Sequence, residues 1–432
     1  MLNKLGWYYI WNTQFSLPER KVLIAFFLRT IIEYSGYFLI LFHHHSIAML
    51  LFNTRDWYPA TLYFELIFCF SLLFSFVIAY RLFYRPVRLK PPVIYYLAFF
   101  AQFICIAFYV PALSWLSSHT GFSMLLMFGI ISTAYIILNG YEKFITLKTL
   151  LAIATTQLKY QFITQGFFLA ITIGLLVASF CIKAAVIGVI PHLNQMKLLV
   201  IPILFLSFLI ACYDCYLLLV RLKLCVLVSP ESLLSSIRLH LNELFARVAV
   251  NIMIGVFLVK WYFNVPFLLQ YVERWSPNSI ANIVLLCGII SVIASIVFKH
   301  VFEKVNIYKL FTYSLLSYLC LVLLITINLY YHHWVTLNVL LMALLYNFLN
   351  GIINRMVHYN YVDLAVNTLL LVVGSTIGII VFSFLSSSLD IIILKQLGIS
   401  SRPISTMLVM LIMISIGCCG FYKMQRNSKN DP

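Results

Sequence analysis

The chain has 432 residues, of which 63% are hydrophobic and only 10% are charged, and its formal net charge is +16. Because soluble domains carry about a quarter of charged residues, this chain has too few charges to cover a water-facing surface, and a soluble globular class is excluded. Nucleic-acid binding would need basic residues gathered on one soluble face, whereas these are spread among short loops.

Apolar runs that are long enough to cross a bilayer as helices recur along the whole chain. The first 21 residues lack the apolar core and cleavage site of a signal peptide, so we expect the first helix to act as the insertion signal. The pattern predicts an all-α polytopic membrane protein with twelve transmembrane helices. In chain order they are expected at residues 22–42, 58–79, 93–113, 122–139, 162–185, 198–220, 249–269, 280–298, 311–330, 335–354, 366–388 and 403–422.

The distribution of Lys and Arg predicts the orientation of these helices, since positive residues accumulate in cytoplasmic loops. With the N-terminus inside, the inner segments hold 21 Lys and Arg and the outer loops hold 5. Both termini are therefore expected in the cytoplasm, and we assign the protein to the bacterial inner membrane. An odd number of helices would break this alternation.

The longest inner segment, 221–248, lies at the middle of the chain. Ser229 suits a helix N-cap and Pro230 suits the first helical position, and apolar residues then fall on one helical face. We expect an amphipathic helix on the inner membrane surface. It divides the chain into an N-terminal half of six helices, 1–220, and a C-terminal half of six, 249–432.

Two inner loops resemble each other at half-chain spacing, Phe83–Lys90 ("FYRPVRLK") and Phe302–Lys309 ("FEKVNIYK"). The twelve helices, the six-plus-six division and the inner termini resemble the major facilitator superfamily. The signature of that family in these two loops is degenerate here, since only Glu303, Lys304 and Lys309 of the second loop keep its character. The resemblance implies a transporter whose first and seventh helices line a central cavity as symmetry mates.

Charges inside the membrane are few, and each costs about 3 kcal/mol by insertion scales. Glu33 is the twelfth residue of the first predicted helix, and Lys260 is the twelfth residue of the seventh. The resemblance implies that they face each other across the substrate path, whereas the structural alternative is that Lys260 snorkels or pairs locally. Arg29 lies one turn before Glu33. An Arg29–Glu33 pair, a Glu33–Lys260 pair and a network of all three remain open.

The tenth predicted helix carries a polar stripe that includes Asn347 and Asn350. These amides either line the cavity and bind substrate or form interhelical hydrogen bonds, each worth about 0.6 kcal/mol. Glu65 and Asp214 join Glu33 as candidates for proton coupling, because burial favours the protonated carboxyl. For Glu65 and Asp214 a hydrogen-bonded packing contact is the favoured alternative.

The histidines cluster on the predicted outer side, at 43–45 and at 332–333. A metal site or a pH sensor is conceivable there, but no acid or cysteine accompanies them at a useful spacing. We favour interfacial histidines without ligands and expect no metal and no cofactor.

The leading functional hypothesis is a monomeric secondary transporter, not an enzyme, that moves a small solute by alternating access, with proton coupling as an option. Its partners are the solute and the lipid bilayer. The chain contains no P-loop sequence. The alternative is a lipid-linked polysaccharide flippase of the export type. Less favoured is a membrane glycosyltransferase using Asp56, or an acyltransferase using His358 and Asp363.

Overall fold

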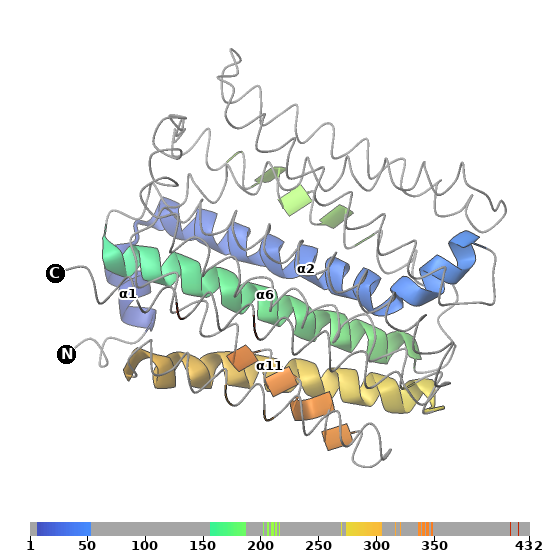
Figure 1. The fold of residues 1–432 in the computed structure, drawn as a ribbon. Helices are drawn as coiled ribbons and strands as arrows, with labels where there is room; N and C mark the ends of the chain where they lie inside the picture. Colours follow the sequence, from blue (N-terminus) through green and yellow to red (C-terminus); the bar gives the residue numbers. More distant parts are fainter. Residues whose placement is uncertain are drawn as a thin grey trace. The chain divides into compact units, whose positions relative to one another are not determined.

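The computed structural model describes residues 7–52, 156–186 and 274–304, together with single positions between 202 and 216, at 269, and between 316 and 422. The regular elements in these three ranges are all helical (Figure 1). In chain order they are α1 (Trp7–Gln14), α2 (Leu17–Phe52), α6 (Gln157–Val186) and α11 (Pro277–Lys304).

The chain forms two compact units. The first comprises Met1–Ile40, Leu50–Asn53 and Phe74–Pro230, and the second comprises Leu41–Met49, Thr54–Leu73 and Glu231–Pro432. Helices α1 and α6 and most of α2 belong to the first unit, and α11 belongs to the second. The division into six and six helices stays a prediction.

Two of the described helices are long and apolar enough to cross a membrane, at Leu158–Ala184 and Pro277–Phe298. They match the predicted helices at 162–185 and 280–298. The third long helix, α2, has 36 residues, which at 1.5 Å per residue is about 54 Å. The hydrocarbon core is only about 30 Å thick, so α2 is longer than a membrane span requires. It begins before and ends after the predicted span at 22–42.

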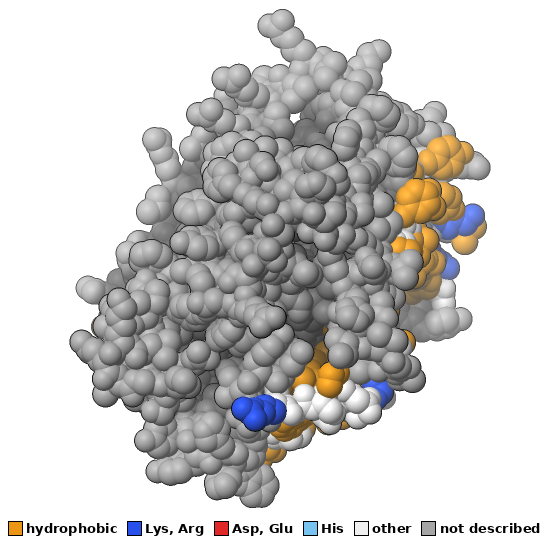
Figure 2. Space-filling model, turned by 90° about the vertical axis from the view of Figure 1, so that its right-hand side faces the viewer, with side chains coloured by type: hydrophobic (Ala, Val, Ile, Leu, Met, Phe, Trp, Pro, Cys, Tyr) orange, Lys and Arg blue, Asp and Glu red, His pale blue; other side chains and the backbone are white. Residues whose placement is uncertain are grey.

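Helix α11 exposes large apolar side chains, which a helix of a soluble protein would bury. Ile293 is 56% exposed and Val297 is 49% exposed. The buried residues of the same helix are partly apolar, such as Ile283, and partly small or polar, such as Ser291 and Ala294. Large apolar side chains on the outside are stable only against lipid or another apolar partner. Figure 2 shows a face on which the described surface side chains are mostly hydrophobic, with Lys and Arg beside them.

Hydroxyl side chains begin two of the helices. Thr156 precedes α6, and its Oγ1 accepts a hydrogen bond of 3.3 Å from the backbone N–H of Lys159. Ser276 precedes α11, where its Oγ accepts from the N–H of Ser279 at 3.2 Å, and Pro277 occupies the first helical position. Both are N-caps that satisfy orphan amide donors.

Helices α2 and α6 lie side by side in the first unit (Figure 1), because α6 presents a groove of small residues. The small residues recur every fourth position, at Gly166, Ala170, Gly174 and Ala178. A Cβ added to Gly174 would lie 2.8 Å from the backbone oxygen of Ile31, and one added to Gly166 would lie 2.4 Å from the ring of Phe27. Small residues at this spacing let two membrane helices approach closely.

The short helix α1, which the hydropathy pattern does not predict, packs against the start of α6. Trp11 and Phe15 both contact the ring of Phe162, with centroid distances of 5.6 and 5.3 Å. Arg20 of α2 caps the end of α1, since its Nη2 donates to the carbonyl of Asn12 at 2.7 Å and its Nε to that of Phe15 at 2.9 Å. These bonds satisfy carbonyls that the helix end leaves open.

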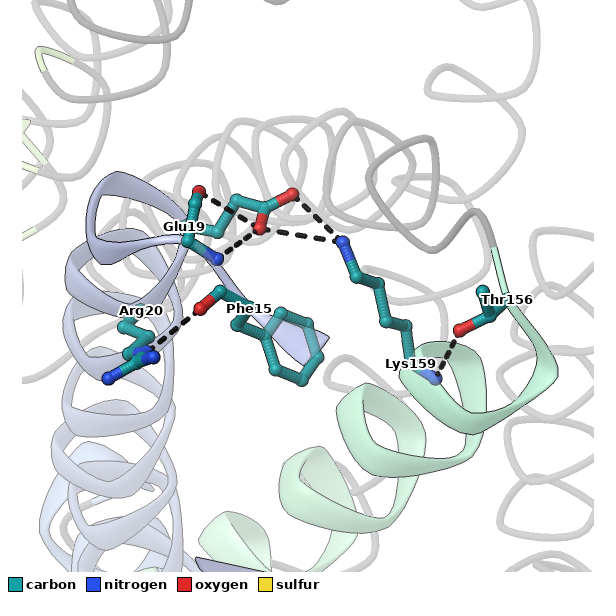
Figure 3. A network of polar contacts seen from close by, with 6 residues as sticks. Phe15, Glu19, Arg20, Thr156 and Lys159 are labelled. Carbon is teal, nitrogen blue, oxygen red and sulfur yellow. Dashed lines mark hydrogen bonds and ion pairs between the residues drawn. The ribbon is translucent and has the colours of Figure 1, made fainter. Parts of the chain in front are cut away.

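An ion pair between Glu19 and Lys159 joins the start of α2 to the start of α6 (Figure 3). Lys159 Nζ lies 3.1 Å from Glu19 Oε1 and also 5.3 Å from the centroid of the Phe15 ring. Glu19 Oε2 accepts the backbone N–H of Ser16 at 2.7 Å, which is the acidic arm of a capping box. Partial burial alone would raise the pKa of Glu19, but these hydrogen bonds and the charge of Lys159 hold that pKa below its ordinary value.

Candidate functional site

Helix α2 carries its two midspan charges on the face turned away from α6. Phe27 and Ile31 contact the glycines of α6. Arg29 and Glu33 each follow one of these residues by two positions, which is a rotation of about 200° around the helix. They are nevertheless 1% and 3% exposed. The pair therefore lies on a buried inner face, separate from the α6 contact and from exposed Leu28.

Arg29 and Glu33 form an ion pair one helical turn apart. Arg29 Nε and Nη2 each donate to Glu33 Oε1 at 3.3 Å. The side chains come from one helix, so their separation is set by the i, i+4 geometry and needs no second element. Buried ions are expensive unless they compensate each other, so this pair is the most costly polar feature among the described buried residues.

The hydroxyl neighbours of the pair on α2 are hydrogen-bonded to their own helix. Thr30 Oγ1 donates to the carbonyl of Phe26 at 2.8 Å, and Ser35 Oγ donates to that of Ile32 at 2.6 Å. Hydroxyls in membrane helices commonly satisfy themselves in this way. The ionisable character of this face therefore comes from the charge pair.

Of the arrangements that the sequence left open, the Arg29–Glu33 pair is present in the structure. Lys260 lies outside the described residues, as do Glu65, Asp214 and Asn350. Their roles, and a network that includes Lys260, stay predictions.

In the second unit, Asn347 is hydrogen-bonded across to α11. Its Nδ2 donates to Ser291 Oγ at 2.7 Å and to the carbonyl of Ala343 at 2.8 Å, and Ser295 Oγ donates to its Oδ1 at 3.3 Å. Asn347 is 1% exposed and Ser291 is 2% exposed. This is the interhelical hydrogen bonding that the sequence left open as the alternative to substrate binding. A substrate role for the same amide remains a hypothesis.

Two features of the first unit were missed at the sequence level. The small-residue groove of α6 could have been read from the sequence, because Gly166 and Gly174 are each followed four residues later by an alanine. The Glu19–Lys159 ion pair joins residues 140 positions apart. No local pattern could have paired them.

The histidine run at 43–45 lies within α2. The side chains of these three residues lie outside the described part of the chain. Among the residues that the structure describes, no group of three His, Cys, Asp or Glu side chains could hold a metal ion. The metal hypothesis therefore has no candidate site among the described residues.

Comparison with known proteins shows what fold this is. No family model matches the chain, and no curated protein matches it. Several solved structures, however, match the chain in their fold. The chain is similar to a bacterial homologue of the iron transporter ferroportin in an outward-facing state, with a TM-score of 0.65 and 11% identity over 92% of this chain and 99% of that one.

The same homologue with soaked iron matches with a TM-score of 0.62 and 11% identity, covering 92% of this chain and 98% of that one. A D-xylose-proton symporter matches with a TM-score of 0.62 and 12% identity, covering 91% of this chain and 96% of that one. The chain therefore has the all-helical fold that these membrane transporters share. This confirms the predicted all-α, transporter-like fold class, whereas the orientation of the termini and the two halves stay predictions. At such identities the likeness shows the fold alone.

Proposed function

We propose that this chain is a secondary active transporter that moves a small solute by alternating access, with the Arg29–Glu33 pair at the solute path. The observation that carries this proposal is the buried ion pair on the inner face of α2. Transporters of this fold place solute and coupling-ion sites near the bilayer midplane. A charge pair retained there at a cost of several kcal/mol needs a use beyond packing.

The depth of the pair supports the same assignment. Within the predicted span at 22–42, Glu33 is central and Arg29 is one turn nearer to α1. Neither can reach water by snorkelling along its own helix. A wet passage walled by protein is the environment in which membrane proteins keep such charges.

Several properties are proposed along with the transporter function. We infer two halves of six helices joined by 221–248, both termini in the cytoplasm, a monomer, and the bacterial inner membrane as the location. Proton coupling through Glu33, with Glu65 and Asp214 as further candidates, belongs to the same proposal, as does solute contact by Asn347, Asn350 and Lys260.

The proposal is tested with the purified full-length chain in proteoliposomes under an imposed proton gradient. Iron and D-xylose are reasonable first solutes because the similar transporters are described with them. We expect gradient-dependent uptake of at least one small solute and its loss in Glu33→Gln. The matched control is Lys21→Gln, which removes an exposed charge from the same helix. Movement of lipid-linked sugars alone would instead support the flippase alternative.

A further inference from the structure

Helix α1 lies at the level of the membrane surface. The candidate membrane span of α6 begins at Leu158, and Phe162, four residues into that span, contacts Trp11 of α1 and Phe15 just after it. The sequence of α1, WYYIWNTQ, contains two Trp and two Tyr and no charged residue. Trp and Tyr are enriched where a membrane meets water. We therefore place α1 in the phospholipid headgroup layer.

Arg20 is a cation at this level whose described partners are all neutral. Its Nη1 donates to the side-chain oxygen of Asn12 at 2.9 Å, and its other contacts are the carbonyls of Asn12 and Phe15. The neighbouring carboxylate of Glu19 pairs with Lys159 instead. A guanidinium has five N–H donors, and the described contacts use three of them. Two donors and the positive charge are therefore left for an anion.

The side chain of Asn12 supplies a further donor beside this guanidinium. Asn12 is exposed, and its side-chain oxygen accepts from Arg20, so the amide NH2 group is the part that can donate to an anion. Arg20 is held by its hydrogen bonds to the end of α1, which reduces the entropy cost of ordering a long side chain on binding. A preorganised guanidinium beside an amide NH2 group suits the oxygens of a phosphate.

An exposed apolar strip runs from Arg20 into the predicted membrane span of α2. Leu17, Ile24 and Leu28 lie three residues before, four residues after and eight residues after Arg20, so they share its helix face. These three side chains are 66%, 48% and 47% exposed. A free phosphate ion would leave this strip bare, whereas a phospholipid carries acyl chains that cover it. The adjoining polar and apolar surfaces match the two parts of a lipid.

We propose that an anionic phospholipid, such as phosphatidylglycerol, binds at this corner of the first unit. The lipid phosphate accepts hydrogen bonds from Arg20 and Asn12, and one acyl chain lies along Ile24 and Leu28. The bound lipid ties the end of α1 to the start of α2 and so stabilises the corner. This inference goes beyond the proposed solute path and does not depend on it.

The charge of the corner favours an anionic lipid over a zwitterionic one. Three positive residues and one negative residue give it a net charge of +2, namely Arg20, Lys21, Lys159 and Glu19. Basic residues at a membrane surface attract anionic lipids. The phosphate of phosphatidylcholine is balanced by its choline group, so we expect phosphatidylcholine to bind this corner more weakly.

The test measures thermal unfolding of the purified full-length protein in a neutral detergent, because a ligand that binds the native state stabilises it. The probes are dioleoyl phosphatidylglycerol, dioleoyl phosphatidylcholine and inorganic phosphate. For wild type we expect phosphatidylglycerol to raise the unfolding temperature with a half-saturating concentration about tenfold below that of phosphatidylcholine. Inorganic phosphate at the same concentrations should not stabilise the protein.

Two variants change the site in different ways. Arg20→Gln removes the guanidinium, whereas Asn12→Asp places a negative charge beside it and keeps an oxygen that accepts from Arg20 Nη1. Both should raise the half-saturating concentration of phosphatidylglycerol about tenfold. Arg274→Gln is the matched control, because it removes an exposed positive charge from another segment of the chain, and it should respond as wild type. Should Arg20→Gln fail to fold, Asn12→Asp decides the question alone.

Several results would overturn the proposal. These are equal stabilisation of wild type by the two lipids, an unchanged response to phosphatidylglycerol in Asn12→Asp, and an equal loss in Arg274→Gln and Arg20→Gln. Stabilisation by inorganic phosphate at the same concentrations would also reject the lipid and indicate a site for free phosphate. Because no solute moves in these measurements, failure of the lipid site and failure of the transporter function are distinguishable.

Discussion

Helices α2 and α11 both bury polar residues in an apolar sequence, but they do so in different ways. On α11 the buried Ser291 is satisfied by the neutral amide of Asn347, which also accepts from Ser295. On α2 the buried groups are fully charged and come from a single helix. A neutral interhelical cluster is explained by packing alone. A buried ion pair is costly to keep in an apolar environment, so our proposal places the function on α2.

The largest effect expected from this comparison follows from removing one member of the charge pair. Arg29→Leu should lower the free energy of unfolding by about 3–5 kcal/mol, because Glu33 is left buried with its countercharge gone. The double variant Arg29→Leu/Glu33→Leu should recover most of that loss, but not transport. Chemical denaturation in detergent gives the stabilities. If the double variant were as unstable as the single one, the pair would be a structural element rather than a functional one.

A smaller effect is expected at the α2–α6 contact. Gly174→Ala should cost about 1–3 kcal/mol, because the new methyl group meets the backbone of Ile31 and the helices must separate. Gly166→Ala is the matched control, since its methyl meets the ring of Phe27, and a ring can turn aside. The same unfolding measurement compares them. Equal losses would show that the groove is not held by backbone contact at Gly174.

The neutral cluster on α11 should respond more weakly than the charge pair. Asn347→Ala removes the donor to Ser291 and the acceptor of Ser295. Interhelical hydrogen bonds in membranes average about 0.6 kcal/mol each, so we expect a loss near 1 kcal/mol. A thermal unfolding series with Ser291→Ala as the partner variant checks this. A loss as large as that of Arg29→Leu would erase the distinction between the two helices.

The smallest effect concerns the Glu19–Lys159 pair at the α1 corner. Because the folded-state pKa of Glu19 is lowered, its contribution is present above the ordinary glutamate pKa and is lost as the pH falls through the lowered value. Lys159→Met should reduce that acid-dependent loss, by less than about 1 kcal/mol. Unfolding of both proteins between neutral and strongly acidic pH measures it. If the free energy of unfolding depended on pH in the same way in both proteins, the pair would make no measurable contribution to stability.

The sequence predicted the membrane class, the fold class and the positions of α6 and α11, because hydropathy reports directly on burial in lipid. It also offered the Arg29–Glu33 pair as one of three open arrangements, since a four-residue spacing within one helix places the two side chains near each other. It missed α1, whose eight residues are too few for a spanning signal. The predicted span at 22–42 is shorter than α2, because the helix begins at Leu17, after the Ser16 cap, and continues to Phe52.

Contacts between distant residues could not be derived from the chain alone. Asn347 was identified as a buried polar residue, but its partner Ser291 lies 56 positions away and has no distinguishing pattern. Lys260 was assigned opposite Glu33 through family resemblance, and it lies outside the described residues. Pairing across helices depends on how the helices are arranged, which hydropathy and periodicity do not report.

The central claim is that the inner face of α2 lines a path open to water during transport. Ala25 shares the helical stripe of Arg29 and Glu33 and is 4% exposed, whereas Ile24 is 48% exposed on the side of α2 opposite the ion pair. In a background whose ten cysteines are replaced by serine, we predict that a charged, water-soluble thiol reagent modifies Ala25→Cys in proteoliposomes and leaves Ile24→Cys unmodified. Modification of Ile24→Cys alone would contradict the account, because water would then reach the face that we assign to lipid.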